Sequence, residues 1–343
     1  MKRKVTILSI DGGGIRGIIP AIILNYIEKR LQKKTKNPNA TLSDYFDLVA
    51  GTSTGGILAC YYLLPPLQKQ KQEQERRSRY FACEAINMYA NHGKEIFNNK
   101  LLRYGVTTKK YPATGLEKIL KDCMGDTTLA KTTKNCMITA YDVTERKAVF
   151  FTTPEAKKYE HKNYLLRDVA RATSAAPTYF EVSAIKSIGG ASSYLIDGAM
   201  FAGNPAMCAL VEANKTQFKS RPNPTINDVF VLSVGTGKEM KKYDYSKAKS
   251  WGAVGWAKPV IDILLSASAE VVDYQMRQLF AVAGRSDCYV RLEPELGKAK
   301  PDMDDASDDN ICQLKDAAEC FIKDHVELLD AVVNRLISES LNI

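Results

Sequence analysis

The stretch that most constrains how this chain can fold is residues 46–64, FDLVAGTSTGGILACYYLL. Phe46–Ala50 has the short apolar composition of a buried strand, and Gly56–Leu64 has the apolar spacing of a helix. Between them, Gly51–Gly55 is a tight turn of small residues with Ser53 at its centre. A strand, a cramped turn carrying a serine and a helix make up the nucleophile elbow of serine hydrolases. The stretch therefore predicts that Ser53 attacks an ester.

The two glycines of this turn, Gly51 and Gly55, are expected to support it. A nucleophile elbow needs strained backbone angles and a close approach to its neighbours, and glycine permits both. The following helix points its N-terminus at the reacting group, where the helix dipole favours developing negative charge. The rest of the chain then has to supply a base and an oxyanion site.

A second glycine-rich turn, Asp11–Gly17 with the sequence DGGGIRG, lies between a predicted buried strand at 4–10 and a predicted helix at 18–31. It contains G-x-G-x-x-G in the context of a dinucleotide-binding fingerprint. Asp11 disfavours that function because it puts a carboxylate where a pyrophosphate would sit, and no second strand ending in an acid follows. A Walker P-loop is excluded because Ile18-Ile19 replace the Lys-Ser/Thr pair.

We interpret this turn as an oxyanion loop. The exposed amides of Gly13 and Gly14 are suited to stabilise an oxyanion, and Arg16 either adds positive charge or fixes the loop. A plain strand-to-helix turn would account for one or two glycines. It would account poorly for three glycines followed by Arg-Gly.

A serine nucleophile also needs a base, which is usually a histidine oriented by an acid. The chain has only three histidines, His92, His161 and His325. None of them follows a predicted strand in a motif-like context. Asp197 is the better candidate, because it ends a predicted strand at 194–196 and precedes Gly198, a position where parallel-sheet enzymes place functional groups. Asp-Gly pairs are also common in ordinary turns, and a carboxylate acts as a base only when it is held close to the hydroxyl, helped by partial desolvation.

The remaining pattern alternates predicted strands and helices. Strands are predicted at 135–141 and 148–152, joined by a turn at 142–147, and again at 228–234, with a helix at 164–172. This order favours α/β layers with a largely parallel sheet. No repeat or linker divides the chain, so we expect one domain over 1–343. Its motif-bearing core is about 5–240, and its C-terminal part, 251–343, is predicted to be helical.

Three segments have less specific patterns. Residues 65–79 are polar and are predicted to be a mobile excursion or the exposed start of a helix continuing through 80–88. Residues 251–280 have apolar side chains near one helical face, which favours a core helix; the alternative is an acyl-channel or lipid-interface helix that includes Trp251 and Trp256. Residues 303–330 are predicted to be an acidic loop followed by one amphipathic, structural helix.

Charge and composition limit the partners. The formal net charge is +9, which favours an anionic partner, and a lipid surface fits better than nucleic acid because no nucleic-acid-binding motif is present.

No apolar run approaches the roughly 20 residues that span a bilayer. The basic and then apolar N-terminus is too short for a signal peptide, so we expect a cytoplasmic location, with peripheral contact to a membrane. The eight cysteines include no CxxC pair and are expected to be reduced thiols, not metal ligands or disulfides.

The motifs DGGGIRG, GTSTG, ATSAAPTYF and DGA, in this order, resemble the signature of the patatin-like phospholipases. YFDLVAGTSTGG, LSVGTG, VDYQ and MDDAS are similar to the plant patatins in particular. The resemblance implies a three-layer α/β/α fold with a mainly parallel central sheet, a Ser-Asp dyad without a catalytic histidine, and no metal or cofactor. By motif, Ser53 matches the nucleophile and Asp197 the base. The segment matching the oxyanion hole contains Gly12, Gly13, Gly14 and Arg16, and Gly17 and Gly198 support the two motifs.

What the resemblance implies for function is a lipid acyl hydrolase of the phospholipase A or lysophospholipase type, acting on phospholipids or other acyl glycerolipids. An alternative is the same hydrolase acting as a membrane-degrading effector that a nucleotide or another ligand activates. A second alternative is a non-catalytic storage or binding protein of this fold, which would not require Ser53, Asp197 and the glycine loop together. A nicotinamide oxidoreductase is the most distant alternative. The oligomeric state stays open.

Overall fold

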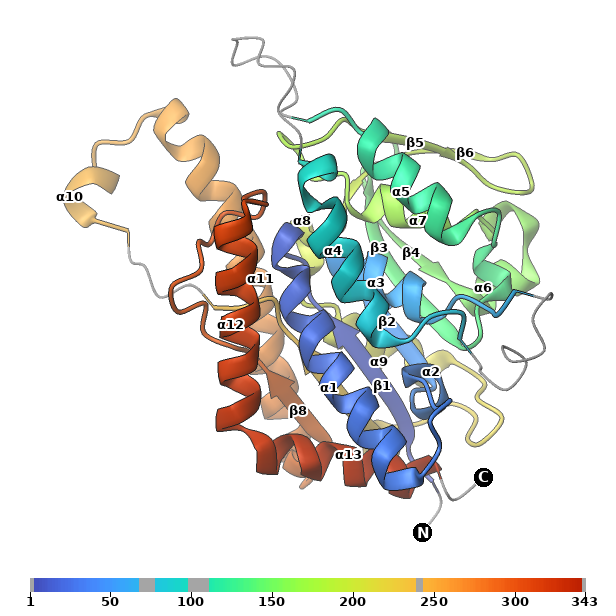
Figure 1. Cartoon of the computed structure of the whole chain (residues 1–343). Helices are drawn as coiled ribbons and strands as arrows, with labels where there is room; N and C mark the ends of the chain where they lie inside the picture. Colours follow the sequence, from blue (N-terminus) through green and yellow to red (C-terminus); the bar gives the residue numbers. More distant parts are fainter. Residues whose placement is uncertain (1–2, 68–77, 98–110, 239–242, 341–343) are drawn as a thin grey trace.

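The computed structural model describes residues 3–67, 78–97, 111–238 and 243–340 (Figure 1). Its described strands form one eight-stranded sheet in the order β5-β6-β3-β2-β1-β7-β8, with β4 paired to β3. The strands are β1 (Val5–Ile10), β2 (Leu48–Gly51), β3 (Asn135–Asp142), β4 (Lys147–Thr152), β5 (Ser183–Lys186), β6 (Ser192–Asp197), β7 (Val229–Val234) and β8 (Tyr289–Leu292). The polar segment predicted at 65–79 lies mostly outside the described residues.

The centre of the sheet is parallel. β1 pairs with β2 and β7, β2 pairs with β3, and β7 pairs with β8, all in parallel. The antiparallel pairs are β3 with β4, β3 with β6 and β5 with β6. The predicted mainly parallel sheet is therefore confirmed, and so is the hairpin predicted at 135–152.

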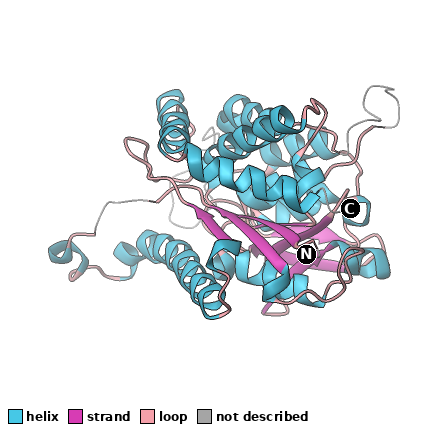
Figure 2. Ribbon diagram, turned by 90° about the horizontal axis from the view of Figure 1, so that it is seen from below, coloured by secondary structure: helices cyan, strands magenta, loops and turns pink. Residues whose placement is uncertain are grey.

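Helices cover both faces of this sheet, as Figure 2 shows edge-on. They are α1 (Ile18–Thr35), α2 (Leu42–Tyr45), α3 (Thr54–Tyr62), α4 (Ala82–Ile96), α5 (Thr114–Met124), α6 (Thr153–Lys158), α7 (Leu166–Thr173), α8 (Ala199–Ala202), α9 (Ala206–Lys215), α10 (Tyr245–Ala248), α11 (Ala253–Val282), α12 (Asp308–Asp324) and α13 (Val326–Ser340). The predicted three-layer α/β/α fold is confirmed.

Two apolar cores fill the two faces because side chains alternate along each strand. In β1, Leu8 and Ile10 belong to the larger core with α1, α3, α4 and α7, whereas Val5 and Ile7 belong to the smaller core with α9 and α11. All six residues of β1 are buried, as expected for a strand inside a parallel sheet that is covered on both faces.

The C-terminal part differs from its predicted secondary structure in two ways. It contributes strand β8, which pairs with β7, in addition to helices. The predicted single helix after residue 307 is two helices, α12 and α13, separated at His325. The His325 ring stacks on Phe321, and its Nδ1 lies 2.9 Å from the Phe321 carbonyl oxygen, so this side chain caps the end of α12 without a glycine or proline.

The helix predicted at 251–280 is present as α11, but the prediction of a core helix is wrong for its N-terminal half. Among the described side chains of α11, only Met276 and Phe280, near its C-terminal end, are fully buried against the sheet. Val254 is 84% exposed, and Trp256, Val260 and Leu264 are exposed as well. The reason is geometric: the 30-residue helix extends past the sheet, and with α10 it projects from the body in Figure 1.

Candidate active site

Ser53 lies at the tip of the sharp turn between β2 and α3. Its backbone is left-handed, with φ 55° and ψ −125°, a conformation that costs a non-glycine residue about 1–3 kcal/mol and clusters at active sites. The two flanking glycines permit the turn: a Cβ on Gly51 would lie 2.2 Å from the Gly55 carbonyl oxygen, and a Cβ on Gly55 would lie 2.2 Å from the Ile10 carbonyl oxygen. The predicted strand–turn–helix is therefore present.

Sheet register brings Asp197 to Ser53. Gly51 at the end of β2 pairs with Ile138 of β3, so Ser53, two residues on, reaches the level of Ala140. Asp197 of β6 pairs with that same Ala140 from the other side of β3. The Asp197 carboxylate and the Ser53 hydroxyl are hydrogen-bonded to each other.

The strand that carries Asp197 runs opposite to the expected direction. The prediction placed Asp197 at the carboxyl end of a parallel strand, whereas β6 is antiparallel to β3. The residue reaches the site nevertheless, because β6 ends level with the elbow. Gly198 follows at once, and a Cβ there would lie 2.1 Å from Thr139 Oγ1, so the close approach of the two strands requires this glycine.

Burial raises the pKa of Asp197. Asp197 is only 3% exposed, and the loss of hydration raises its pKa to about 7. Hydrogen bonds from Ser53 and from the Ala199 amide act in the opposite direction and lower the pKa, but burial has the larger effect. The Ala199 N–H donates to Asp197 Oδ1 over 2.8 Å. A carboxylate with a pKa near neutrality can take up the proton of a serine hydroxyl more readily than an exposed one.

The glycine loop lies beside Ser53. A Cβ on Gly12 would be 3.2 Å from Ser53 Cβ, and a Cβ on Gly13 would be 2.3 Å from Thr236 Oγ1. Gly14 has φ 60°, and a Cβ there would be 2.1 Å from the Met303 carbonyl oxygen. Side chains at these positions would push the loop away from the elbow.

The backbone amides of this loop have different partners. The Gly12 amide donates to the Gly203 carbonyl over 3.0 Å, so it anchors the loop and is occupied. In the part of the chain that the structure describes, the Gly13 and Gly14 amides donate to no other backbone carbonyl.

Arg16 and Gly17 also contact the loop and the elbow. Arg16 Nε donates to the Gly13 carbonyl over 3.3 Å, and Arg16 Nη1 donates to the Gly237 carbonyl over 3.5 Å. These contacts are those of a residue that fixes the loop, which is one of the two functions predicted for it. A Cβ on Gly17 would lie 2.2 Å from Thr54 Oγ1 at the start of α3.

Threonines that the sequence analysis did not single out hold the elbow. The Ser53 amide donates to Thr173 Oγ1 over 2.8 Å, and the hydroxyls of Thr52 and Thr139 are 2.7 Å apart. Thr173 lies in the ATSAAPTYF motif, so its motif membership was a usable signal. Thr139 lies within a buried strand and belongs to none of the motifs, so no sequence signal marked it.

Each of the three histidines has a partner other than Ser53 or Asp197, and His325 also lines the cavity that opens in front of Ser53. His92 Nδ1 is 3.2 Å from Glu95 on the surface of α4, His161 packs beside Tyr159, and His325 caps α12. In the described ranges no group of three or more His, Cys, Asp or Glu side chains is arranged to hold a metal ion.

A cavity of about 1020 Å³ opens in front of Ser53 and Asp197. Its wall includes apolar side chains from both faces of the molecule. They are Ile57, Ile96, Phe97, Leu116, Phe180, Met200, Trp251 and Ile263. Phe97 and Tyr111 pack edge to face and Phe180 packs at a tilt against both, with ring centroids 5.4–6.1 Å apart. A hydrogen-bonded Ser–Asp pair beside a cavity whose wall is partly apolar and partly charged is suited to hydrolysis of an ester with a long acyl chain.

Comparisons with known proteins identify the class. The family model "Patatin-like phospholipase" matches residues 8–210. Patatin-like protein 2 of Oryza sativa subsp. indica is 34% identical over 96% of this chain and 86% of its own length, and Patatin-like protein 2 of Arabidopsis thaliana is 35% identical over 85% and 76%. Patatin-04/09 of Solanum tuberosum is 31% identical over 94% of this chain and 85% of its own length.

The chain belongs to the patatin-like phospholipase family. This membership confirms the resemblance stated from the motifs and supports a lipid acyl hydrolase activity in general. Among the described residues, no helix combines the length and the apolar character needed to cross a bilayer.

Proposed function

We propose that the protein hydrolyses fatty-acyl esters of membrane glycerolipids through an acyl-enzyme on Ser53, with Asp197 as the base. The observation that carries this proposal is the hydrogen bond between the Ser53 hydroxyl, on a strained turn, and the buried carboxylate of Asp197. Family membership makes an acyl lipid the substrate class. The apolar wall of the adjacent cavity is suited to an acyl chain.

The chemistry proceeds in two balanced halves. Asp197 takes the Ser53 proton as Oγ attacks the carbonyl carbon, and the tetrahedral intermediate then breaks its bond to the alcohol of the lysolipid, which leaves with the proton from Asp197. Water enters and gives a proton to Asp197 as it attacks the acyl-enzyme. The second intermediate breaks its bond to Ser53 Oγ, which recovers the proton, and the fatty acid is released.

The oxyanion of both intermediates is bound by the amides of Gly13 and Gly14, with the Thr54 amide at the start of α3 as a further donor. Removing one oxyanion donor lowers turnover by roughly 10²–10³. In this proposal Gly12 and Arg16 anchor the loop that presents these amides. The α3 helix dipole adds favourable potential at the same point.

The test compares Ser53→Ala and Asp197→Asn with wild type on a p-nitrophenyl fatty-acid ester and on mixed phospholipid vesicles, with products identified by lipid mass spectrometry. We expect Ser53→Ala to abolish turnover and Asp197→Asn to lower it by roughly 10²–10⁴, the usual contribution of a general base. Ser338→Ala, on the exposed face of α13, and His92→Gln are matched controls that should keep the wild-type rate. Full activity in either dyad variant would refute the mechanism, and a wild-type protein without hydrolytic activity would favour a binding or storage function.

A further inference from the structure

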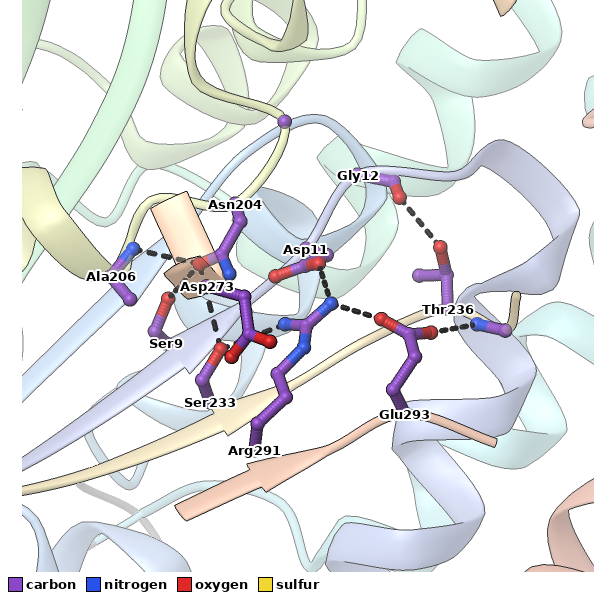
Figure 3. A network of polar contacts seen from close by, with 12 residues as sticks. Ser9, Asp11, Gly12, Asn204, Ala206, Ser233, Thr236, Asp273, Arg291 and Glu293 are labelled. Carbon is purple, nitrogen blue, oxygen red and sulfur yellow. Dashed lines mark hydrogen bonds and ion pairs between the residues drawn. The ribbon is translucent and has the colours of Figure 1, made fainter. Parts of the chain in front are cut away.

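A row of polar side chains crosses three neighbouring strands beneath α11. Ser9 of β1 pairs with Ser233 of β7, and Ser233 pairs with Arg291 of β8. Side chains at paired positions of parallel strands point to the same face, so all three lie in the layer between the sheet and α11. Arg291 Nη1 donates to Ser233 Oγ over 2.8 Å, as Figure 3 shows.

Arg291 extends beyond the strand ends and forms a buried ion pair. Its Nη2 is 2.5 Å from Asp11 Oδ2, and both side chains are 5% exposed. The same nitrogen contacts Glu293 Oε2. In the described part of the chain Asp11 Oδ1 has no hydrogen-bond partner, so Arg291 is what orients this carboxylate.

Two arms of this network end on neighbouring residues of the glycine loop, Asp11 and Gly12. The first arm is Asp11 itself, which directly precedes Gly12. The second runs through Glu293, whose Oε1 accepts the Gly237 N–H over 3.0 Å, to Thr236, whose hydroxyl donates to the Gly12 carbonyl over 2.7 Å. Figure 3 shows the Gly12 carbonyl bound by Thr236, with the Asp11 carboxylate bound by Arg291 nearby.

Stability alone is a weak reason for such an arrangement. The free energy that it costs to desolvate a buried ion pair can exceed the attraction between its charges. Replacing such a pair with apolar side chains of similar volume often leaves a protein equally stable or more stable. A guanidinium bound to two carboxylates does fix their orientation, because its planar fork of N–H donors binds each carboxylate in one direction. A loop that presents backbone donors to a transition state benefits from being held this closely.

We propose that Arg291, Glu293 and Thr236 are positioning residues that hold the glycine loop in its oxyanion-binding geometry. These residues lie after the segment 8–210 that the family model matches, and Arg291 is 280 residues from Asp11. The inference rests on the proposed function, since it assigns the loop an oxyanion. It adds a support that the C-terminal part of the chain supplies to that loop.

The test uses Arg291→Met, which keeps volume and removes the fork, and the pair Thr236→Val and Thr236→Ser, which remove or keep one hydroxyl. Arg335→Met is the control, because Arg335 is also partly buried and ion-paired, to Glu339 at 3.1 Å, but it lies on α13 away from the loop. For each folded variant, kcat and KM are measured on a p-nitrophenyl ester and on its thionoester. Sulfur accepts hydrogen bonds poorly, so the ratio of ester to thionoester turnover reports the oxyanion hole.

We expect Arg291→Met and Thr236→Val to lower kcat by about 10²-fold, the size of loss that a misplacement of roughly 1 Å produces, with little change in KM. The ratio of ester to thionoester turnover should fall by about tenfold in both variants. Thr236→Ser and Arg335→Met should keep the wild-type ratio of ester to thionoester turnover. This holds for Arg335→Met even if the substitution lowers the melting temperature, because Arg335 does not contact the loop.

The inference is overturned if Arg291→Met and Thr236→Val keep kcat and the turnover ratio within about twofold of wild type, or if Arg335→Met loses them equally. Should Arg291→Met fail to fold, the Thr236 pair decides by itself, because valine is isosteric with threonine. Ser53→Ala, measured in parallel, separates the two proposals. If it stays active the proposed function fails, whereas an inactive Ser53→Ala beside an unaffected Thr236→Val refutes only the positioning function.

Discussion

At the scale of the residue, Asp197 has two properties that do not usually occur together. It is nearly inaccessible to solvent, yet within the described part of the chain only the Ser53 hydroxyl and the Ala199 amide donate hydrogen bonds that offset its loss of hydration. Burial therefore dominates and raises its pKa to about 7. An ordinary aspartate would be ionised well below this pH, so the titration of Asp197 falls in a range where it can be observed.

The first prediction concerns rate. Since only the ionised carboxylate can accept the Ser53 proton, kcat/KM on a soluble ester should rise with pH and level off above the raised pKa of Asp197, about 7. A stopped assay between pH 5 and 9, with substrate hydrolysis in buffer subtracted, measures this profile. A flat profile down to pH 5 would contradict a base of raised pKa.

The second prediction concerns stability. Folded Asp197 stays protonated up to about pH 7, whereas in the unfolded chain it ionises near 3.9. Its contribution to stability is thus present below pH 4 and is lost as pH rises through 7. An asparagine side chain in its place would stay neutral throughout, so Asp197→Asn should be more stable than wild type at pH 8, by roughly 1–4 kcal/mol at about 1.4 kcal/mol per pKa unit, and no more stable at pH 4.

Urea unfolding of both proteins at the two pH values measures this difference. Burial also raises the pKa values of Asp11 and Glu28, and their titration cancels between wild type and variant. Asp228→Asn is a suitable control because hydrogen bonds lower the pKa of Asp228, with the opposite sign of dependence. An Asp197→Asn protein that is less stable than wild type at pH 8 would show that ionisation of the buried Asp197 carboxylate does not destabilise the fold as predicted.

At the scale of the element, α11 serves two environments. Its C-terminal half packs on the sheet through Met276 and Phe280, whereas Ile263, in its N-terminal half, and Trp251, just before it begins, line the cavity. Beside them Val254 and Trp256 are exposed, and Lys247 and Lys249 lie on or just after α10. Apolar and aromatic side chains with nearby lysines are typical of a surface that inserts shallowly into an anionic lipid interface. We propose that this end of α11 makes the peripheral membrane contact.

The third prediction uses the two ends of the same helix. Val254→Glu should weaken sedimentation with anionic vesicles several-fold, because it places a negative charge in the inserted surface, while activity on a soluble ester stays unchanged. Val282→Glu is the matched control, since Val282 is 89% exposed at the opposite end of α11 and should bind as wild type does. Equal binding by both variants would remove α11 from the membrane contact.

At the scale of the whole molecule, the chain combines a positive net charge with an active-site cavity bordered by the proposed contact surface. We propose that it is one domain, because β8, from the C-terminal part, completes the sheet beside β7. With a formal charge of +9, the molecule is attracted as a whole to anionic surfaces. This attraction has a longer reach than any single contact and is screened by salt, with a Debye length of about 10 Å at 0.1 M.

The fourth prediction follows from this screening. Hydrolysis of anionic phospholipid vesicles should fall as NaCl rises from low to high concentration, whereas hydrolysis of neutral vesicles and of a soluble ester should change little. Fatty-acid release is the measurement, and the soluble ester is the control for direct effects of salt on turnover. Equal rates on neutral and anionic vesicles at both salt concentrations would contradict an electrostatic contribution to membrane contact.

The sequence by itself determined the elements whose physical causes are local. A buried strand, a small-residue turn and a helix are adjacent in the chain, so the elbow around Ser53 could be predicted from composition and spacing, and so could the glycine loop and most of the parallel strands. Only the tertiary structure decided what depends on register and on distant neighbours. It brings Asp197 to Ser53 on an antiparallel strand, which no local pattern indicates. It places Arg291 on Asp11 across 280 residues, and it leaves half of an apolar helix outside the core. Side-chain periodicity states which face of a helix is apolar, but what covers that face is a property of the assembled layers.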